Sequence, residues 1–427
     1  MTGVLTRITD GFLLVAVPVF LLFPGFGGYT RMFYWKFGAF LTLTVAYLLT
    51  MAVTAAVRRL PLLPRMGTAR VALLIYLAWT WVATALSPNA ARALLGVSRF
   101  EGALTVTLYC LLFLLVSVHG RVTARTVAVF GAAVSAECLL CLAQLFGLDP
   151  FGLYPEGMNF YNCGRNPRTF LGTVGNVDFL AAFFAVAIPI LLFTCLCTRH
   201  RLRLWLLVPL ALSVTVLLAM GTVGGVLGAA VGCTLFGGLC LPRRLRRITL
   251  CALALAAALL LVAARCIDGK GAWHALHAIL SGTPDPLLGS GRVHIWQTVL
   301  AAARERLFAG YGPDTMLLHG FAPFTREDAV LGSLVAHIDT AHSEPLNILY
   351  HQGLPALVAY LVFLGTLLWE AVRRRTGACI ALGAALLCYF VQSLFGISVF
   401  LCAVWFWLAA ALLLAHIHSI PKENSHV

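Results

Sequence analysis

Long apolar runs separated by short polar segments dominate the chain from its beginning to about residue 416. Most of these runs approach the roughly 20 residues that an α-helix needs to cross a bilayer. Because lipid admits only helices or closed barrels, the pattern predicts an all-α polytopic membrane protein with about twelve transmembrane helices in a single integral membrane domain, residues 1–427. The predicted spans are Gly11–Phe26, Phe37–Val57, Ala69–Leu86, Ala103–Val118, Thr126–Leu145, Thr173–Cys197, Leu204–Met220, Thr222–Leu241, Ile248–Ala264, Leu354–Val372, Ala378–Leu394 and Ile397–His416.

Two polar segments are too long to be simple connections between spans. They cover residues 148–172 and 266–353, and the longer one lies between spans 9 and 10. Within it, apolar residues recur at helical spacing, which predicts an amphipathic helix in an ordered, helical cap. The expected buried stripe is Val293, Trp296, Leu300, Ala303 and Leu307, with His294, Gln297, Arg304 and Glu305 facing away.

The charge distribution fixes an orientation. The chain is 61% hydrophobic and 11% charged, and its net charge of +14 could suggest a nucleic-acid partner. However, the basic clusters all follow even-numbered spans, as the positive-inside rule requires of cytoplasmic loops. We therefore expect a multi-pass protein of the cell inner (cytoplasmic) membrane, with both termini cytoplasmic, contacts to membrane lipids and no nucleic-acid partner. The clusters are Arg58–Arg70, Arg121 and Arg125, Arg199–Arg203, Arg243–Arg247, and Arg373–Arg375.

Few charges lie at membrane depth. Glu137 falls inside span 5, and Asp178 lies near the outer end of span 6. A charge within a span is costly, so each is expected to have a partner, and for Glu137 a structural and a functional role both stay open. The chain shows no internal repeat of the kind found in many transporters, which weakens, without removing, the alternative of a twelve-span transporter.

Four stretches on the predicted outer side carry most of the reactive side chains. RNPRTFLGTVGN places Arg165 and Arg168 before a glycine-rich opening to span 6, and GSGRVHIW places Arg292 at the start of the amphipathic helix. FAGYGPDT is a turn that contains Asp314. HIDTAHSEPLNILYHQG contains Asp339 and His342 just ahead of a predicted helix, with a capping hydroxyl and an early proline at its start.

Together these motifs resemble the O-antigen ligase and O-antigen polymerase superfamily of the bacterial envelope. The matching elements are Arg168 before GTVGN, Arg292 before VHIW, GYGPD, DTAHSE, and the segment SPNAARALLGVSRFEG at residues 87–102. The resemblance implies a C-type glycosyltransferase fold. It implies transfer of a preassembled glycan from a polyprenyl diphosphate donor to a hydroxyl of a glycan or glycolipid acceptor on the outer face of the membrane. It also implies that no metal ion and no other cofactor takes part.

The resemblance assigns catalytic roles to His342, Arg292 and Arg168, and the chemistry of these side chains agrees. A guanidinium binds phosphate oxygens with two parallel hydrogen bonds and stays charged, which suits a leaving diphosphate. A histidine near neutrality can accept the proton of an acceptor hydroxyl. Substrate-binding roles are expected for Arg165, Asn176, Asp339 and Asp314. The chain departs from the family pattern at Ser343, Pro345 and Asp178, which leaves the acceptor open.

Three alternatives remain open at this stage. A polymerase would join lipid-linked repeat units of a capsule, exopolysaccharide or other surface glycan, with the same motifs. The other two are a transporter and a non-catalytic partner of an envelope complex. A zinc site is disfavoured, because His274 and His277 share a helix face but lack a third ligand.

Overall fold

The computed structural model describes residues 3–62, 66–163, 168–198, 201–268, 272–283, 288–328 and 332–420. In these residues every predicted span corresponds to a helix. Nine helices are long and apolar enough to cross a membrane, and three shorter apolar helices, α5, α9 and α15, have 17 residues each. The polytopic architecture is therefore confirmed.

The helices of the bundle are α1 (Gly3–Leu22), α2 (Tyr29–Arg58), α3 (Thr68–Ala85), α5 (Ala103–His119), α6 (Ala124–Leu145), α7 (Val177–Cys197), α8 (Leu202–Met220), α9 (Val223–Leu239), α10 (Arg243–Cys266), α14 (Leu354–Arg374), α15 (Gly377–Ser393) and α16 (Phe400–Ser419). A short helix, α4 (Ala90–Leu95), lies between α3 and α5.

The first two helices begin earlier than the apolar runs predict. α2 starts at Tyr29 and includes Lys36, a residue that a hydropathy argument excludes from a span. The Lys36 side chain is buried, and its ammonium donates hydrogen bonds to the carbonyl oxygens of Phe20 and Leu21 at 3.1 and 2.7 Å. These carbonyls lie in the last turn of α1, where no helical partner is available. Lys36 thus caps α1 from the neighbouring helix.

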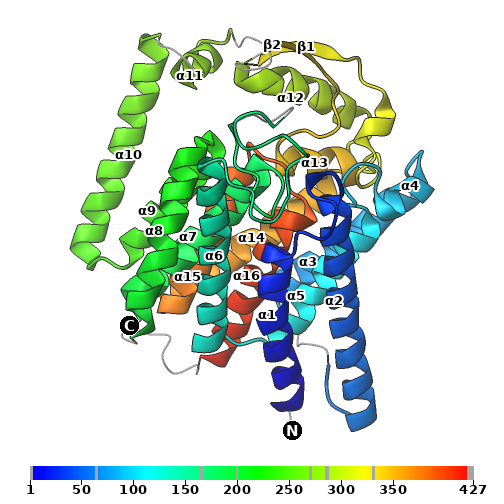
Figure 1. The fold of residues 1–427 in the computed structure, drawn as a ribbon, viewed down its shortest axis with the longest axis vertical. Coiled ribbons are helices and arrows are strands. Elements are labelled where there is room, and N and C mark those ends of the chain that lie inside the picture. The colour runs from blue at the N-terminus through cyan, green and yellow to red at the C-terminus, as the bar shows by residue number, and fades with distance from the viewer. Residues whose placement is uncertain are drawn as a thin grey trace.

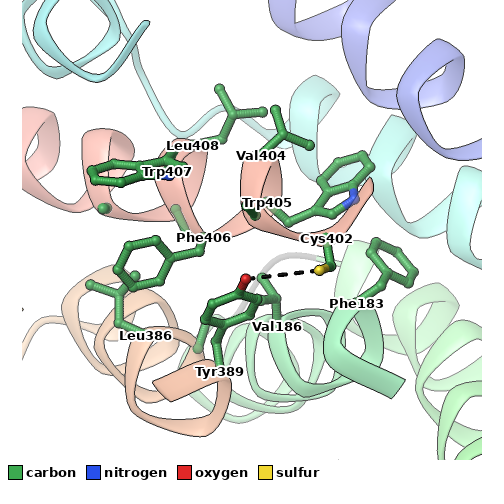
Figure 2. Close-up of a cluster of buried hydrophobic side chains, with 14 of the residues drawn as sticks. Phe183, Val186, Leu386, Tyr389, Cys402, Val404, Trp405, Phe406, Trp407 and Leu408 are labelled. Carbon is green, nitrogen blue, oxygen red and sulfur yellow. Dashed lines mark hydrogen bonds between the residues drawn. The ribbon is translucent and has the colours of Figure 1, made fainter. Parts of the chain in front are cut away.

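The densest part of the core surrounds α7, α15 and α16. Both α7 and α16 are buried along most of their length, and α15 packs against α7, α9 and α16. Figure 2 shows large side chains from these three helices filling the space between them, including Trp405 against Phe183 with ring centroids 5.1 Å apart. By contrast, α10 stands apart from the bundle (Figure 1), and Ala264 is its one buried residue.

The residues between α10 and α14 form a cap over one end of the bundle, opposite the start of α1 (Figure 1). The cap contains α11 (Ala272–Leu280), α12 (Leu288–Glu305), a 3-10 helix η1 (Met316–His319), strands β1 (Phe324–Asp328) and β2 (Gly332–Ala336), and α13 (Glu344–Gln352). The expectation of an all-α, wholly helical cap is wrong in one respect, because β1 and β2 pair as an antiparallel hairpin with Thr325 opposite Val335. β-Branched residues at such paired positions favour strands.

The buried face of α12 also differs from the predicted stripe. Of the predicted stripe, Ala303 is buried, whereas Leu300 is exposed and Val293 is only half-buried. The residues Ile295, Val299 and Ala302, outside the predicted stripe, are also buried. Apolar residues occupy two neighbouring faces of this helix, so periodicity alone does not choose between them. The face that is buried packs against Ile338 and Ala341 of the segment before α13.

Glu137 belongs to a buried polar network. Its carboxylate accepts hydrogen bonds from the backbone N–H and the hydroxyl of Thr173, at 2.9 and 2.6 Å. Next to it, Gln144 accepts from the N–H of Gly172 at 3.0 Å, and Tyr29 donates to the Gly172 carbonyl at 2.7 Å. α6 and α2 thereby hold the loop that leads from Arg168 into α7. Glu137 has a structural partner, as its depth in the membrane requires.

Candidate functional site

The predicted base, His342, lies in a tight segment just before α13. Its backbone has a φ of 49°, in the left-handed region. Ser343 occupies the N-cap position of α13 and Pro345 lies in its first turn, as predicted. The expected capping bond is absent, however, because the Ser343 hydroxyl accepts no hydrogen bond from the first turn of the helix. The extended backbone of Ser343 nevertheless turns the chain from His342 directly into α13.

Left-handed backbone at residues other than glycine recurs at the predicted site. Six such residues occur in the described parts of the chain, and Arg59 and Arg375 are helix C-caps. The other four are Phe100, Arg168, Asp314 and His342, and each belongs to one of the motif stretches identified in the sequence. Each such residue costs about 1–3 kcal/mol when its conformation is strained, and strain of this kind concentrates at functional sites.

The helix that carries Arg292 is fastened to the segment that carries His342. The indole N–H of Trp296 donates to the Ala341 carbonyl at 2.9 Å. Arg292 precedes Trp296 by four residues, so the two side chains share one face of α12. In the described structure the Nε atom of Arg292 is buried without a hydrogen-bond partner. The contact between Trp296 and Ala341 therefore brings the regions of two predicted catalytic residues together.

Arg292 also connects the cap to α7. Asp178, in the first turn of α7, interacts electrostatically with Arg292. Asn176 is the N-cap of the same helix, and its side-chain oxygen accepts from the N–H groups of Asp178 and Phe179 at 2.8 and 3.3 Å. The structure thus gives Asn176 a helix-capping contact, while its expected role in substrate binding stays a prediction.

Arg168 lies on the loop before α7 and is exposed. Its backbone N–H donates to the Phe160 carbonyl at 2.6 Å, but its guanidinium makes no hydrogen bond or ion pair with any described residue. No contact within the described residues joins it to His342. Arg165, the other predicted arginine of this loop, lies outside the described residues.

The two predicted acids of the cap contact the segment that follows α4. Asp339 forms an ion pair with Arg99, with 2.7 Å between the Asp339 carboxylate and a terminal guanidinium nitrogen. Asp314 is buried, and its carboxylate accepts from the Ser98 N–H, the Ser98 hydroxyl and the Arg99 N–H at 3.1, 2.7 and 2.8 Å. Three protein donors leave Asp314 well satisfied, which favours a positioning role over direct contact with substrate.

A pocket opens between these elements. Glu344, Asn347, Ile348 and His351 face it from one side of α13, at the spacing of a single helical face. The remaining lining residues are Tyr76, Arg99, Glu101, Val106, Pro313, Asp314, Asp339, Thr340, Gln352, Ile397 and Ser398. The pocket is therefore built by α3, α5 and the segment before it, the cap, and the loop before α16.

Burial perturbs the titratable groups of the pocket. It raises the pKa of Glu344 to about 7, against a smaller opposing effect of the hydrogen bond with Ser398. It also raises the pKa of Glu101 well above its usual range, although Tyr109 donates a hydrogen bond to this carboxylate at 2.8 Å. The pKa of His351 is lowered to about 4 by burial, which outweighs the attraction of Asp314. At neutral pH His351 is therefore neutral.

The cap elements of this site lie in a segment that matches a known protein family. Residues 208–361 match the O-antigen ligase family. No curated protein matches the chain significantly. The family match confirms the resemblance seen in the motifs, and it covers Arg292, Asp314, Asp339 and His342, whereas Arg168 and Asn176 precede it. O-antigen ligase family proteins are membrane enzymes that process lipid-linked glycans as ligases or polymerases.

Several residues that line the pocket received no role from the sequence. Arg99 and Glu101 lie in the segment 87–102, which contributed to the resemblance but received no role. His351 also received no role, although it lines the pocket. The spacing of Glu344, Asn347 and His351 was an available signal, since it places three polar side chains on one face of a short helix.

Proposed function

We propose that this protein transfers a preassembled glycan from a polyprenyl diphosphate carrier to an acceptor hydroxyl on the outer face of the cytoplasmic membrane, as an O-antigen ligase does. The observation that carries the proposal is the bond from Trp296 to Ala341, which holds the helix of Arg292 against the segment of His342. Arg292, a potential phosphate-binding cation, and His342, a potential proton acceptor, therefore lie on two hydrogen-bonded elements at the same end of the bundle.

In this proposal Arg292 and Arg168 bind the diphosphate and stabilise the charge that develops as it leaves. His342 accepts the proton of the attacking hydroxyl, whose oxygen forms the new glycosidic bond as the bond to the diphosphate breaks. The reaction needs no further reactant and no metal ion. The orientation follows the same logic, with the cap outside and both termini in the cytoplasm.

The test is transfer by purified protein in proteoliposomes, from a polyprenyl diphosphate-linked glycan to a lipid acceptor. His342→Ala and His342→Gln should each lower the rate by roughly 10²–10⁴, the usual contribution of a general base. His337→Ala is the matched control, because His337 is exposed and five residues away. Full activity of a well-folded His342→Gln protein would remove the base from the mechanism.

The same assay separates ligase from polymerase. A ligase joins the glycan to the unrelated lipid acceptor, whereas a polymerase lengthens the glycan on the carrier itself. Solute uptake without any transfer would instead favour the transporter alternative.

A further inference from the structure

The pocket beside α13 contains buried polar atoms whose hydrogen bonds the described protein does not supply. Gln352 is 4% exposed, and its side-chain oxygen has no partner. Its amide nitrogen is 3.4 Å from the Tyr76 hydroxyl, a long hydrogen bond. The Nε2 atom of His351 and the Nε atom of Arg99 are likewise buried without a partner among the described residues. Gln352, His351 and Arg99 all line the pocket. Since nearly all buried polar groups in proteins are hydrogen-bonded, unpartnered polar atoms on three of its lining residues point to a polar ligand.

The charges of the pocket argue against an anionic ligand. Arg99 is the one arginine or lysine among its described lining residues, and Asp339 already pairs with it. Glu101 and Glu344 would repel a phosphate or carboxylate if ionised, and if protonated they would supply no positive charge. The diphosphate-binding role of Arg292 therefore has no counterpart in this pocket.

What the pocket offers instead is mainly hydrogen-bond acceptors, with a few donors and an aromatic wall. The acceptors include the carboxyl groups of Glu101 and Glu344 and the side-chain oxygen of Gln352, and the aromatic ring is that of Tyr76. A ligand with several hydroxyl groups matches this set, because each hydroxyl donates one hydrogen bond and can accept others.

We propose that this pocket binds one uncharged sugar residue of the glycan substrate through its hydroxyl groups, at a subsite separate from the arginines that bind diphosphate. The proposal rests on the proposed function, and it names a substrate contact that the proposed function leaves open. Thr340 and Glu344, which line the pocket, are each two residues from His342, so a bound sugar lies beside the segment of the proposed base. The same sugar chemistry occurs in the donor glycan and in the acceptor.

Binding can be measured apart from catalysis by saturation-transfer-difference NMR on protein in nanodiscs. The probes are methyl glycosides of glucose, galactose and N-acetylglucosamine, with inorganic pyrophosphate as the anionic comparison. The variants are Gln352→Leu, of similar size without the acceptor, and Glu344→Gln. The control is Gln297→Leu, the same change at an exposed position of α12 outside the pocket.

We expect at least one glycoside to bind the natural protein and the Gln297→Leu control equally. Gln352→Leu should weaken that binding by roughly three- to tenfold, the worth of one hydrogen bond. Pyrophosphate binding should not change. A variant that had lost its structure would bind pyrophosphate less well too, so this measurement separates the two cases. In the transfer assay, a rise of similar size in KM for the donor alone or for the acceptor alone identifies which substrate supplies the sugar.

The proposal is overturned if neither glycoside binding nor either KM responds to Gln352→Leu and Glu344→Gln. It is also overturned if pyrophosphate competes with the glycosides for the same site. If glycosides bind in a Gln352-dependent way but no transfer from a polyprenyl diphosphate occurs, the pocket stands and the proposed function fails. If transfer occurs and both variants match the natural protein in binding and KM, the proposed function stands and the pocket assignment fails.

Discussion

Replacing Trp296 by Phe tests the contact that joins the two halves of the proposed site. The change keeps an aromatic ring but removes the N–H that donates to the Ala341 carbonyl at 2.9 Å. Ala341 is 0% exposed, so that carbonyl loses a donor that water does not readily replace. Leaving such an acceptor unsatisfied costs about 1–3 kcal/mol.

Loss of this hydrogen bond should also slow the transfer reaction, because His342 directly follows Ala341 in the chain. Small displacements of a catalytic group cost up to about 10²-fold in rate, and we expect the turnover of Trp296→Phe to fall roughly ten- to a hundredfold. The KM for the donor should change little, since Arg292 and Arg168 keep their charges.

The assay is transfer in proteoliposomes, with thermal stability measured in parallel. Trp81→Phe is the matched control, because the Trp81 N–H also makes a hydrogen bond, to the Thr107 hydroxyl at 3.1 Å, but on the exposed surface of the bundle. If Trp296→Phe turns over as fast as Trp81→Phe, the contact does not position His342 and the argument for the site loses its main support.

Three further predictions follow from the geometry and the charges. Arg292→Lys should transfer almost as poorly as Arg292→Ala, because a point charge does not replace a planar fork on diphosphate; near-native rates for the lysine variant would leave Arg292 only an electrostatic role. The pKa of Glu344 rises from 4.5 to about 7 on folding, so the folded state holds a proton that the unfolded state releases. Stability should therefore fall as pH rises from 4.5 to 7, and thermal scans of Glu344→Gln should show a smaller decline across that window. A single cysteine at Gly320, in a background without other cysteines, should react with an impermeant thiol reagent from the outer side; reaction only from the cytoplasmic side would invert the orientation.

Local patterns in the sequence were sufficient to predict the helical bundle. Hydrophobicity and helix length act within one segment, so the spans are recovered with errors mainly at their ends. The start of α2 shows the limit of this information. Lys36 is tolerated inside a helix only because the end of α1 offers it two carbonyl oxygens, and that is a contact between two elements.

The motif residues were also visible in the sequence, because their chemistry and order resemble those of the O-antigen ligase family. The sequence could not say which of them contact one another. Periodicity predicted a buried stripe of α12 that includes Val293 and Leu300, whereas packing against Ile338 and Ala341 buries a neighbouring face.

Which residues line the pocket is determined only by the tertiary structure. Arg99 and Asp339 are 240 residues apart, and Tyr76 and Gln352 are 276 apart, yet each pair meets at its wall. The identity of a residue determines which bonds it can form, whereas the bonds it does form, and the atoms left without a partner, depend on which distant segments the bundle brings beside it. For this protein the sequence determined the membrane architecture and the candidate chemistry, and the packing of the cap on the bundle decided where that chemistry is assembled.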